Sequence, residues 1–202
     1  MADTLVTTRL QEGGLGTFFH PRDIARLGVS YRRLQGLVSE GTVENLGNGL
    51  YRLAEVEPTE AETQAMVAAA VPNAVICLLT ALHFHNIGTQ APHEVWIAID
   101  RKARKPVRAP ARVRVVRFSG AMLTYGVVVH SLLGVPVRVT SPARTVVDCF
   151  RYRNKVGLDI ALEALHDALR LRVATVDQIM RTADACRARS VVSAYVRAAL
   201  VS

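Results

Sequence analysis

The sequence predicts an α+β protein in which an N-terminal winged helix-turn-helix precedes a mixed α+β domain with a small sheet and C-terminal helices. Three observations predict it. Two short helical patterns and a hairpin pattern open the chain, alternating strand patterns fill its middle, and helical patterns close it. We expect domains over residues 1–56 and 57–202. With 202 residues, of which 50% are hydrophobic, the chain can bury two modest cores.

The N-terminal helices are predicted from local signals. His20–Leu27 is a short amphipathic pattern with Pro21 at its first position, where a missing N–H costs nothing. Ser30 is placed to cap a second helix over Tyr31–Glu40. A further helix over Leu5–Glu12 would complete a three-helix core.

A hairpin follows the helices. Thr42–Leu46 and Leu50–Leu53 alternate like strands around Gly47-Asn48-Gly49, a strong turn signal. A short helix, a sharp turn, a second helix and a hairpin are the parts of a DNA-reading module. The sequence therefore predicts DNA binding.

The second helix carries the side chains for base readout. A guanidinium can form two hydrogen bonds to guanine, and a glutamine can do so to adenine. We predict base readout by Arg32, Arg33 and Gln35, and backbone positioning by Ser30, Tyr31, Asn48 and Arg52. Two alternatives stay open: these residues are ordinary solvated helix positions, or the module binds protein.

The rest of the chain alternates between helical and strand patterns. The first helices are expected over Thr59–Ala70 and Ala74–His85. Strands are expected over Glu94–Ile99, Arg112–Phe118, Tyr125–His130 and Val135–Thr140. The last helices are expected from Ser141 to about Tyr152, and over Leu158–Leu171, Thr175–Ala185 and Arg189–Val201.

Positive charge is concentrated in the second domain. The net charge is +8, and residues 101–153 hold twelve basic residues against Asp148 alone. We predict an anion-binding surface made of Arg101, Lys102, Arg104, Lys105, Arg108, Arg112 and Arg114. Arg112 and Arg114 would share one strand face, opposite Val113 and Val115. A phosphate backbone or an acidic partner fits this surface, and the alternative is a solvated loop.

The segment from Ser141 to Asp148 is the sharpest motif of the second domain. Ser141 caps a helix, Pro142 occupies its first turn, and Arg144 and Asp148 stand four residues apart on one face. We interpret the two as a structural ion pair that holds this helix on the sheet, and the alternative is a functional contact.

Patterns for catalysis and metal binding are weak. His83-Phe84-His85 lacks an acidic or cysteine partner. Asp100-Arg101-Lys102 matches half of a nuclease site, but Glu94 lies on the same strand, so a Mg²⁺-dependent nuclease is a remote alternative. We predict no enzyme activity, no cofactor and no metal.

The chain also lacks signals for membranes and secretion. No apolar run reaches the roughly 18–20 residues of a bilayer span, and the first residues lack a signal-peptide pattern. Cys77, Cys149 and Cys186 are odd in number and far apart, which predicts buried, reduced thiols. We therefore expect a cytoplasmic protein.

Most of the chain resembles the AbiEi-type antitoxins of bacterial abortive-infection (type IV) toxin–antitoxin systems. The resemblance is carried by four segments: Gly49–Leu53, Val75–His83, Glu94–Ile99 and Val135–Asp148. The last is the most specific, and the others are permissive patterns.

The resemblance implies a two-domain antitoxin. Its winged domain would repress its own operon by binding inverted-repeat operator DNA in two copies. Its C-terminal domain would neutralise a nucleotidyltransferase toxin without a stable complex. The chain departs from this pattern in its nearly neutral wing, so the helix arginines and the basic strand region would act together. A protein-interaction module, or a solitary regulator without a toxin, remains the alternative.

Overall fold

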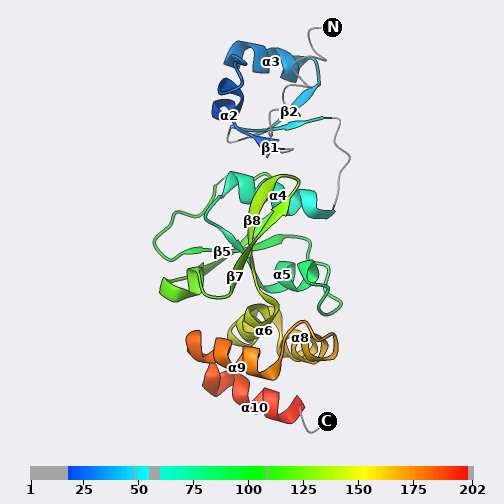
Figure 1. Ribbon diagram of the computed structural model, residues 1–202, viewed down its shortest axis with the longest axis vertical. Coiled ribbons are helices and arrows are strands. Elements are labelled where there is room, and N and C mark those ends of the chain that lie inside the picture. Colours follow the sequence, from blue (N-terminus) through cyan, green and yellow to red (C-terminus); the bar gives the residue numbers. More distant parts are fainter. Residues whose placement is uncertain (1–17, 48, 55–59, 108, 200–202) are drawn as a thin grey trace. The chain divides into compact units, whose positions relative to one another are not determined.

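The computed structural model describes residues 18–47, 49–54, 60–107 and 109–199 of the chain. It is mixed α+β, with two sheets and a run of helices at the C-terminal end (Figure 1). Residue contacts divide the chain into two compact units. The first contains the described residues up to Pro72, together with Pro106–Ala111 and His130–Val137, and the second contains the remainder. The expected helix over Leu5–Glu12 and the expected boundary at residues 56/57 lie outside the described residues.

The elements up to Pro72 are, in chain order, β1 (Phe18–Phe19), α2 (Pro21–Ala25), α3 (Tyr31–Ser39), β2 (Val43–Gly47), β3 (Leu50–Leu53) and α4 (Glu60–Ala70). The three strands form an antiparallel sheet in the order β1-β3-β2. The expected helices and hairpin are thus formed, and β1 adds a strand that the sequence pattern did not indicate.

Local chemistry explains where α3 begins. The Ser30 side chain accepts a hydrogen bond from the backbone N–H of Arg33 at 3.2 Å, which confirms the expected cap. Leu34 and Leu37 face inward and are almost fully buried. They join Ile24 of α2 and Tyr51 of β3 in one small core, which fixes α3 against α2 and the hairpin.

The remaining elements, in chain order, are β4 (Val75–Ile76), α5 (Leu78–Phe84), β5 (Val95–Asp100), β6 (Val113–Phe118), the 3₁₀ helix η1 (Gly120–Leu123), β7 (Val127–Leu132), β8 (Val135–Thr140), α6 (Pro142–Arg151), α7 (Arg153–Val156), α8 (Leu158–Arg170), α9 (Val176–Ala185) and α10 (Arg189–Ala199). The five strands form a mixed sheet in the order β6-β5-β4-β8-β7. Strand β4 runs antiparallel to β5 and parallel to β8, and β5 runs parallel to β6.

Helix α6 organises the helical layer. It packs against α5, α8, α9 and α10, and Figure 1 shows it between the sheet and the last two helices. Its residues Val146, Val147 and Phe150 are fully buried in the main core.

The expected single helix over Ala74–His85 is wrong. Val75 and Ile76 form strand β4, and only Leu78–Phe84 are helical. Ile76 is paired on both sides, with Ile97 of β5 and Val139 of β8. These β-branched side chains suit a central strand, and the partners that select it lie far along the chain.

Gly126 offers a test of the packing around α6. Its φ is +62°, and an added Cβ would lie 2.9 Å from Arg144 Cβ. Gly120 has a similar φ of +54°, but nothing lies within 4 Å of its added Cβ. We expect Gly120→Ala to lower the free energy of unfolding by about 1 kcal/mol, because of backbone strain alone.

Gly126→Ala should lower it by about 2 kcal/mol more, because the added methyl displaces Arg144. Denaturant unfolding followed by circular dichroism measures both. Equal losses in the two variants would contradict the close approach at Gly126.

Candidate nucleic-acid interface

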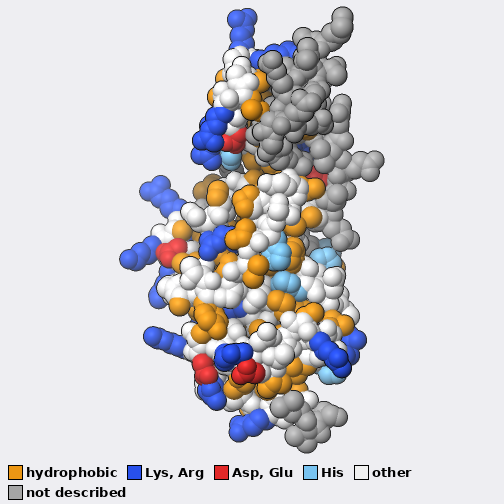
Figure 2. Space-filling model, in the orientation of Figure 1, with side chains coloured by type: hydrophobic (Ala, Val, Ile, Leu, Met, Phe, Trp, Pro, Cys, Tyr) orange, Lys and Arg blue, Asp and Glu red, His pale blue; other side chains and the backbone are white. Residues whose placement is uncertain are grey.

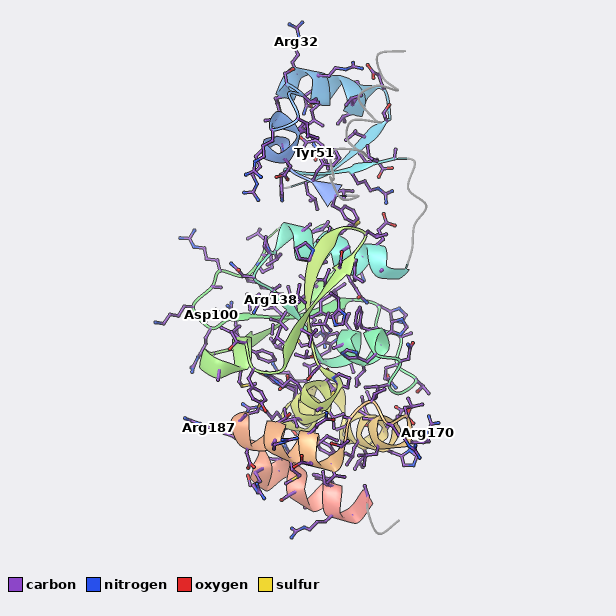
Figure 3. All side chains as sticks on the ribbon, in the orientation of Figure 1. Arg32, Tyr51, Asp100, Arg138, Arg170 and Arg187 are labelled. Atoms are coloured by element: carbon purple, nitrogen blue, oxygen red, sulfur yellow. The ribbon has the colours of Figure 1, made fainter. Side chains whose placement is uncertain are left out.

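The outward face of α3 carries the first group of expected DNA-binding residues. Tyr31 is 59% exposed, and Arg32 is exposed and projects away from the helix (Figure 3). Among the described residues Arg32 forms no ion pair. A hydrogen bond with Tyr51 raises the pKa of the Tyr31 hydroxyl, so this hydroxyl stays protonated at neutral pH.

Two other expected base-reading residues are held by neighbours. Arg33 Nη1 donates a hydrogen bond to Glu40 Oε1 at 3.1 Å. Gln35 Nε2 donates to the hydroxyl of Tyr51 at 3.3 Å, and Gln35 is half-buried. The helix therefore leaves Tyr31 and Arg32 exposed, whereas Gln35 ties α3 to β3.

Arg52 of the hairpin is neutralised within the protein. Its guanidinium pairs with Glu44 Oε2 at 2.7 Å and also with Glu62 of α4, and its side chain is only 15% exposed. The hydrogen bond from Arg52 lowers the pKa of Glu44, so the carboxylate is charged at neutral pH. Arg52 thus faces two carboxylates, and the other expected wing contact, Asn48, lies outside the described residues.

The loop after β5 carries most of the expected basic surface. Arg101, Lys102, Arg104 and Lys105 are all exposed, and Figure 2 shows lysine and arginine side chains projecting from the molecular surface. Arg108 lies outside the described residues. We call the four exposed cations the basic loop.

The start of the basic loop is anchored. The side chain of Asp100, labelled in Figure 3, accepts a hydrogen bond from the backbone N–H of Lys102 at 2.7 Å. Arg117 Nη1 donates to the carbonyl oxygens of Asp100 and Ala103 at 2.8 and 2.5 Å. Because Arg117 satisfies these carbonyls, the loop leaves the sheet in a defined direction.

Arg112 and Arg114 are both exposed, as expected, but the basic face does not continue along β6. Arg114 shares its face with Val116 and Phe118, which are buried in the main core. Arg114 itself pairs with Glu94 at 2.5 Å and lies over the ring of Trp96 at 4.9 Å. The parallel register places Trp96 beside Arg114, so the face changes from exposed to buried along the strand.

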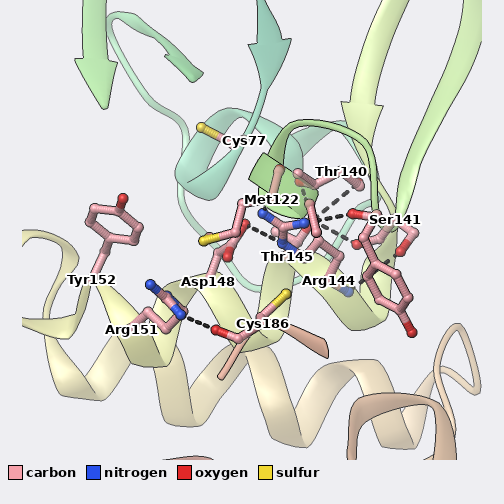
Figure 4. A network of polar contacts seen from close by, with 12 residues as sticks. Cys77, Met122, Thr140, Ser141, Arg144, Thr145, Asp148, Arg151, Tyr152 and Cys186 are labelled. Atoms are coloured by element: carbon pink, nitrogen blue, oxygen red, sulfur yellow. Dashed lines mark hydrogen bonds and ion pairs between the residues drawn. The ribbon is translucent and has the colours of Figure 1, made fainter. Parts of the chain in front are cut away.

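The Arg144–Asp148 pair is formed and completely buried (Figure 4). Arg144 Nε donates to Asp148 Oδ2 at 2.8 Å. Its other nitrogens donate to the carbonyl oxygens of Tyr125 and Met122, at 2.5 and 3.0 Å. These carbonyls belong to the segment that leads into β7, so the pair holds that segment against α6. This geometry favours the structural interpretation of the motif.

A second polar cluster holds the junction between β8 and α6. The hydroxyls of Thr140 and Thr145 lie 2.8 Å apart, and that of Thr145 also reaches the carbonyl oxygen of Ser141 at 2.9 Å. His85 Nε2 lies 2.7 Å from the carbonyl oxygen of Thr140. The His83-Phe84-His85 motif therefore includes a histidine that is engaged with the backbone.

Burial dominates the titration of the groups around α6. Burial raises the pKa of Asp148 to about 6, although Arg144 opposes the shift. Asp148 Oδ1 has no hydrogen-bond partner among the described residues. Burial also raises the pKa of the Cys77 and Cys149 thiols, so both stay protonated at neutral pH. The expected burial of the three cysteines is confirmed.

The carboxylates considered for a nuclease site are separated. Glu94 directly precedes β5 and Asp100 ends it, which places the two about 20 Å apart along an extended strand. In the part of the chain that the structure describes, no group of three or more His, Cys, Asp or Glu residues is placed to hold a metal ion. None of the described helices is long and apolar enough to cross a membrane.

The sequence did not predict the carboxylates that pair with the arginines of the candidate interface. Glu40, Glu44 and Glu62 compensate Arg33 and Arg52. Only the Glu44–Arg52 pair had a local signal, because the two residues stand opposite each other in the expected hairpin.

Comparison with known proteins gives a fold but no family. No protein-family model and no curated protein matches the chain. Among solved structures, the chain is similar to the crystal structure of the RV2827C protein from Mycobacterium tuberculosis, with a TM-score of 0.62 and 12% sequence identity. The match covers 99% of this chain and 80% of that one. At this identity the likeness shows the fold alone.

The raised pKa of Asp148 predicts a pH-dependent stability. Its native value of about 6 lies above the value of about 4 in an unfolded chain. The native state therefore binds a proton more readily, and this contribution to stability is complete below about pH 4 and is lost as the pH rises through 6. Asp148→Asn removes this titration.

Relative to Asp148→Asn, the original chain should lose about 2 kcal/mol of unfolding free energy between about pH 4.5 and pH 7. Urea unfolding of both chains across this range measures the difference. A difference that stays constant with pH would mean that Arg144 keeps Asp148 ionised throughout.

Proposed function

We propose that the chain is a DNA-binding antitoxin that represses its own type IV toxin–antitoxin operon. In this proposal α2, α3 and the β2–β3 hairpin act as a winged helix-turn-helix on inverted-repeat operator DNA. The region after residue 56 neutralises a nucleotidyltransferase toxin without a stable complex. The observation that carries the DNA-binding part is the exposed first turn of α3, where Arg32 projects outward and Tyr31 is 59% exposed.

The expected DNA-binding residues fall into two groups: those that contact base edges, and those that position α3 and the hairpin. Arg32 is the first candidate for a base edge, because it is exposed at the start of the helix that enters the groove. Arg33 is the second, after release from Glu40. Gln35 and Arg52 act instead by positioning α3 and the hairpin, because each is engaged within the protein.

The basic loop supplies the sequence-independent part of the affinity. Its four cations are exposed, and phosphate contacts of this kind position a protein without reading bases. The antitoxin part of the proposal is supported by the resemblance of Val135–Asp148 to the AbiEi-type antitoxins. The same exposed cations favour a second candidate function, in which the basic loop grips an acidic protein partner.

A mobility shift separates the two candidates. The full chain is mixed with the duplex directly upstream of its own gene, or with a scrambled duplex, at two salt concentrations. A shift specific to the upstream duplex supports the autorepressor. If no duplex shifts, and the chain instead copurifies with the product of the neighbouring gene, the protein-interaction module replaces it.

Arg32→Ala tests base readout. Loss of a two-bond base contact should weaken binding to the upstream duplex by about 1–3 kcal/mol, with little change on scrambled DNA. Fluorescence anisotropy titrations with both duplexes measure this. Arg197→Ala, which removes an exposed arginine of α10, is the matched control and should change neither affinity. Equal losses on both duplexes would reassign Arg32 to the phosphate backbone.

The double substitution of Lys102 and Lys105 by Gln tests the basic loop. Two lost phosphate contacts should weaken binding to both duplexes alike and reduce the slope of log K against log salt by about 2. Titrations at four salt concentrations give the slope. An unchanged slope would remove the basic loop from the DNA interface.

A further inference from the structure

A hollow of 580 Å³ in the second unit is lined by α5, the segment before β5, β5, β6 and α7. Its apolar wall includes Leu79 and Trp96, and its charged wall is made of Glu94, Arg112, Arg114 and Lys155. Three permanent cations and one carboxylate thus line the hollow. The volume lies within the range of about 300–1,000 Å³ that is usual for small-molecule sites.

Arg114 forms a fixed, flat surface in this hollow. Glu94 holds its Nε at 2.5 Å, and the Trp96 ring supports the guanidinium from 4.9 Å. The side chain is nevertheless 53% exposed, so the guanidinium retains an accessible part. A guanidinium that is held in place in this way can stack on a planar base, as arginine does in nucleic-acid recognition.

Arg112 and Lys155 supply charge that the protein does not compensate. Both side chains are exposed, and among the described residues neither pairs with a carboxylate. Lys155 Nζ lies 5.6 Å from the ring of Tyr152, which restricts where the ammonium can lie. Two such cations at one hollow favour a phosphate group, which accepts several charge-assisted hydrogen bonds.

We propose that this hollow binds a nucleotide. The base stacks on the guanidinium of Arg114, and the phosphate lies between Arg112 and Lys155. A free nucleotide and the phosphorylated end of a nucleic acid share this chemistry. None of its lining residues belongs to α3, so it stands or falls independently of operator binding.

The basic loop does not offer the same combination. Its cations are equally exposed, but none of them lines this hollow or lies over the ring of a described aromatic residue. Specific binding of a nucleotide therefore requires Arg112 and Lys155, whereas general attraction of anions requires only the net charge of +8.

Trp96 provides the readout, because it is the chain's only tryptophan and it lines the hollow. The full chain is titrated with AMP, ATP, adenosine and inorganic phosphate while its tryptophan fluorescence is recorded, with calorimetry as a second measurement. We expect saturable binding of AMP or ATP, and binding at least about tenfold weaker for adenosine and for phosphate. Arg112→Gln and Lys155→Gln should each raise Kd by about tenfold, which is the loss of one charge-assisted hydrogen bond.

Lys102→Gln is the matched control, since it removes a cation of the basic loop and should leave Kd unchanged. Arg32→Ala should also leave it unchanged. A single-stranded oligonucleotide with and without a 5′-phosphate identifies the source: phosphate-dependent binding that Arg112→Gln abolishes would assign the site to a nucleic-acid end.

Three results would overturn the proposal. The first is that no nucleotide and no phosphorylated oligonucleotide binds saturably. The second is an equal loss in Lys102→Gln and Lys155→Gln, which would indicate general attraction of anions. The third is saturable binding of AMP or ATP that Arg112→Gln and Lys155→Gln both leave unchanged.

Discussion

The buried Arg144–Asp148 pair is the interaction on which the second unit depends. Both side chains are fully buried, so each has lost its hydration. The free energy of this desolvation must be offset by the ion pair itself and by well-placed hydrogen bonds. Arg144 does so with three hydrogen bonds, two of them to carbonyl oxygens in the segment before β7. A hydrophobic pair would fill the same space but would leave those carbonyls unsatisfied. The charge pair thus selects one arrangement of the β7 approach against α6, and the packing of α5, α8, α9 and α10 on α6 builds on it.

Pairing within the protein also decides which cations are available to bind a ligand. Arg52 faces two carboxylates, Arg33 has Glu40, and Arg117 is occupied with backbone carbonyls. Those arginines stabilise the fold and, while paired, are not available to a ligand, even where the surrounding sequence is basic. Among the described cations of the two proposed sites, Arg32, the basic loop and the pair at the hollow have no carboxylate partner. A count of positive charge along the sequence therefore overstates the binding surface.

The sequence predicted elements whose signals are local. Helix α6 follows from the Ser141 cap and the four-residue spacing of Arg144 and Asp148, and α3 follows from its Ser30 cap. Strand β4 could not be predicted, because two residues are too few to show the alternating pattern of a strand. Their pairing depends on Ile97 and Val139, which lie far along the chain. The Gln35–Tyr51 contact and the stacking of Arg114 on Trp96 were missed for the same reason. Each depends on a register between strands or helices that only the folded chain defines.

The distribution of open charge separates affinity from discrimination in the proposed DNA complex. The α3 face offers few open cations, so it would add little to sequence-independent affinity, which comes from phosphate contacts. The basic loop offers four exposed cations but no element that reads bases. Binding by one copy would then be strongly salt-dependent and only modestly selective, since one good base contact discriminates by about 1–3 kcal/mol. Two copies on an inverted repeat double that free energy of discrimination. Selectivity in this protein would therefore come from symmetry of the site more than from the reading surface of one chain.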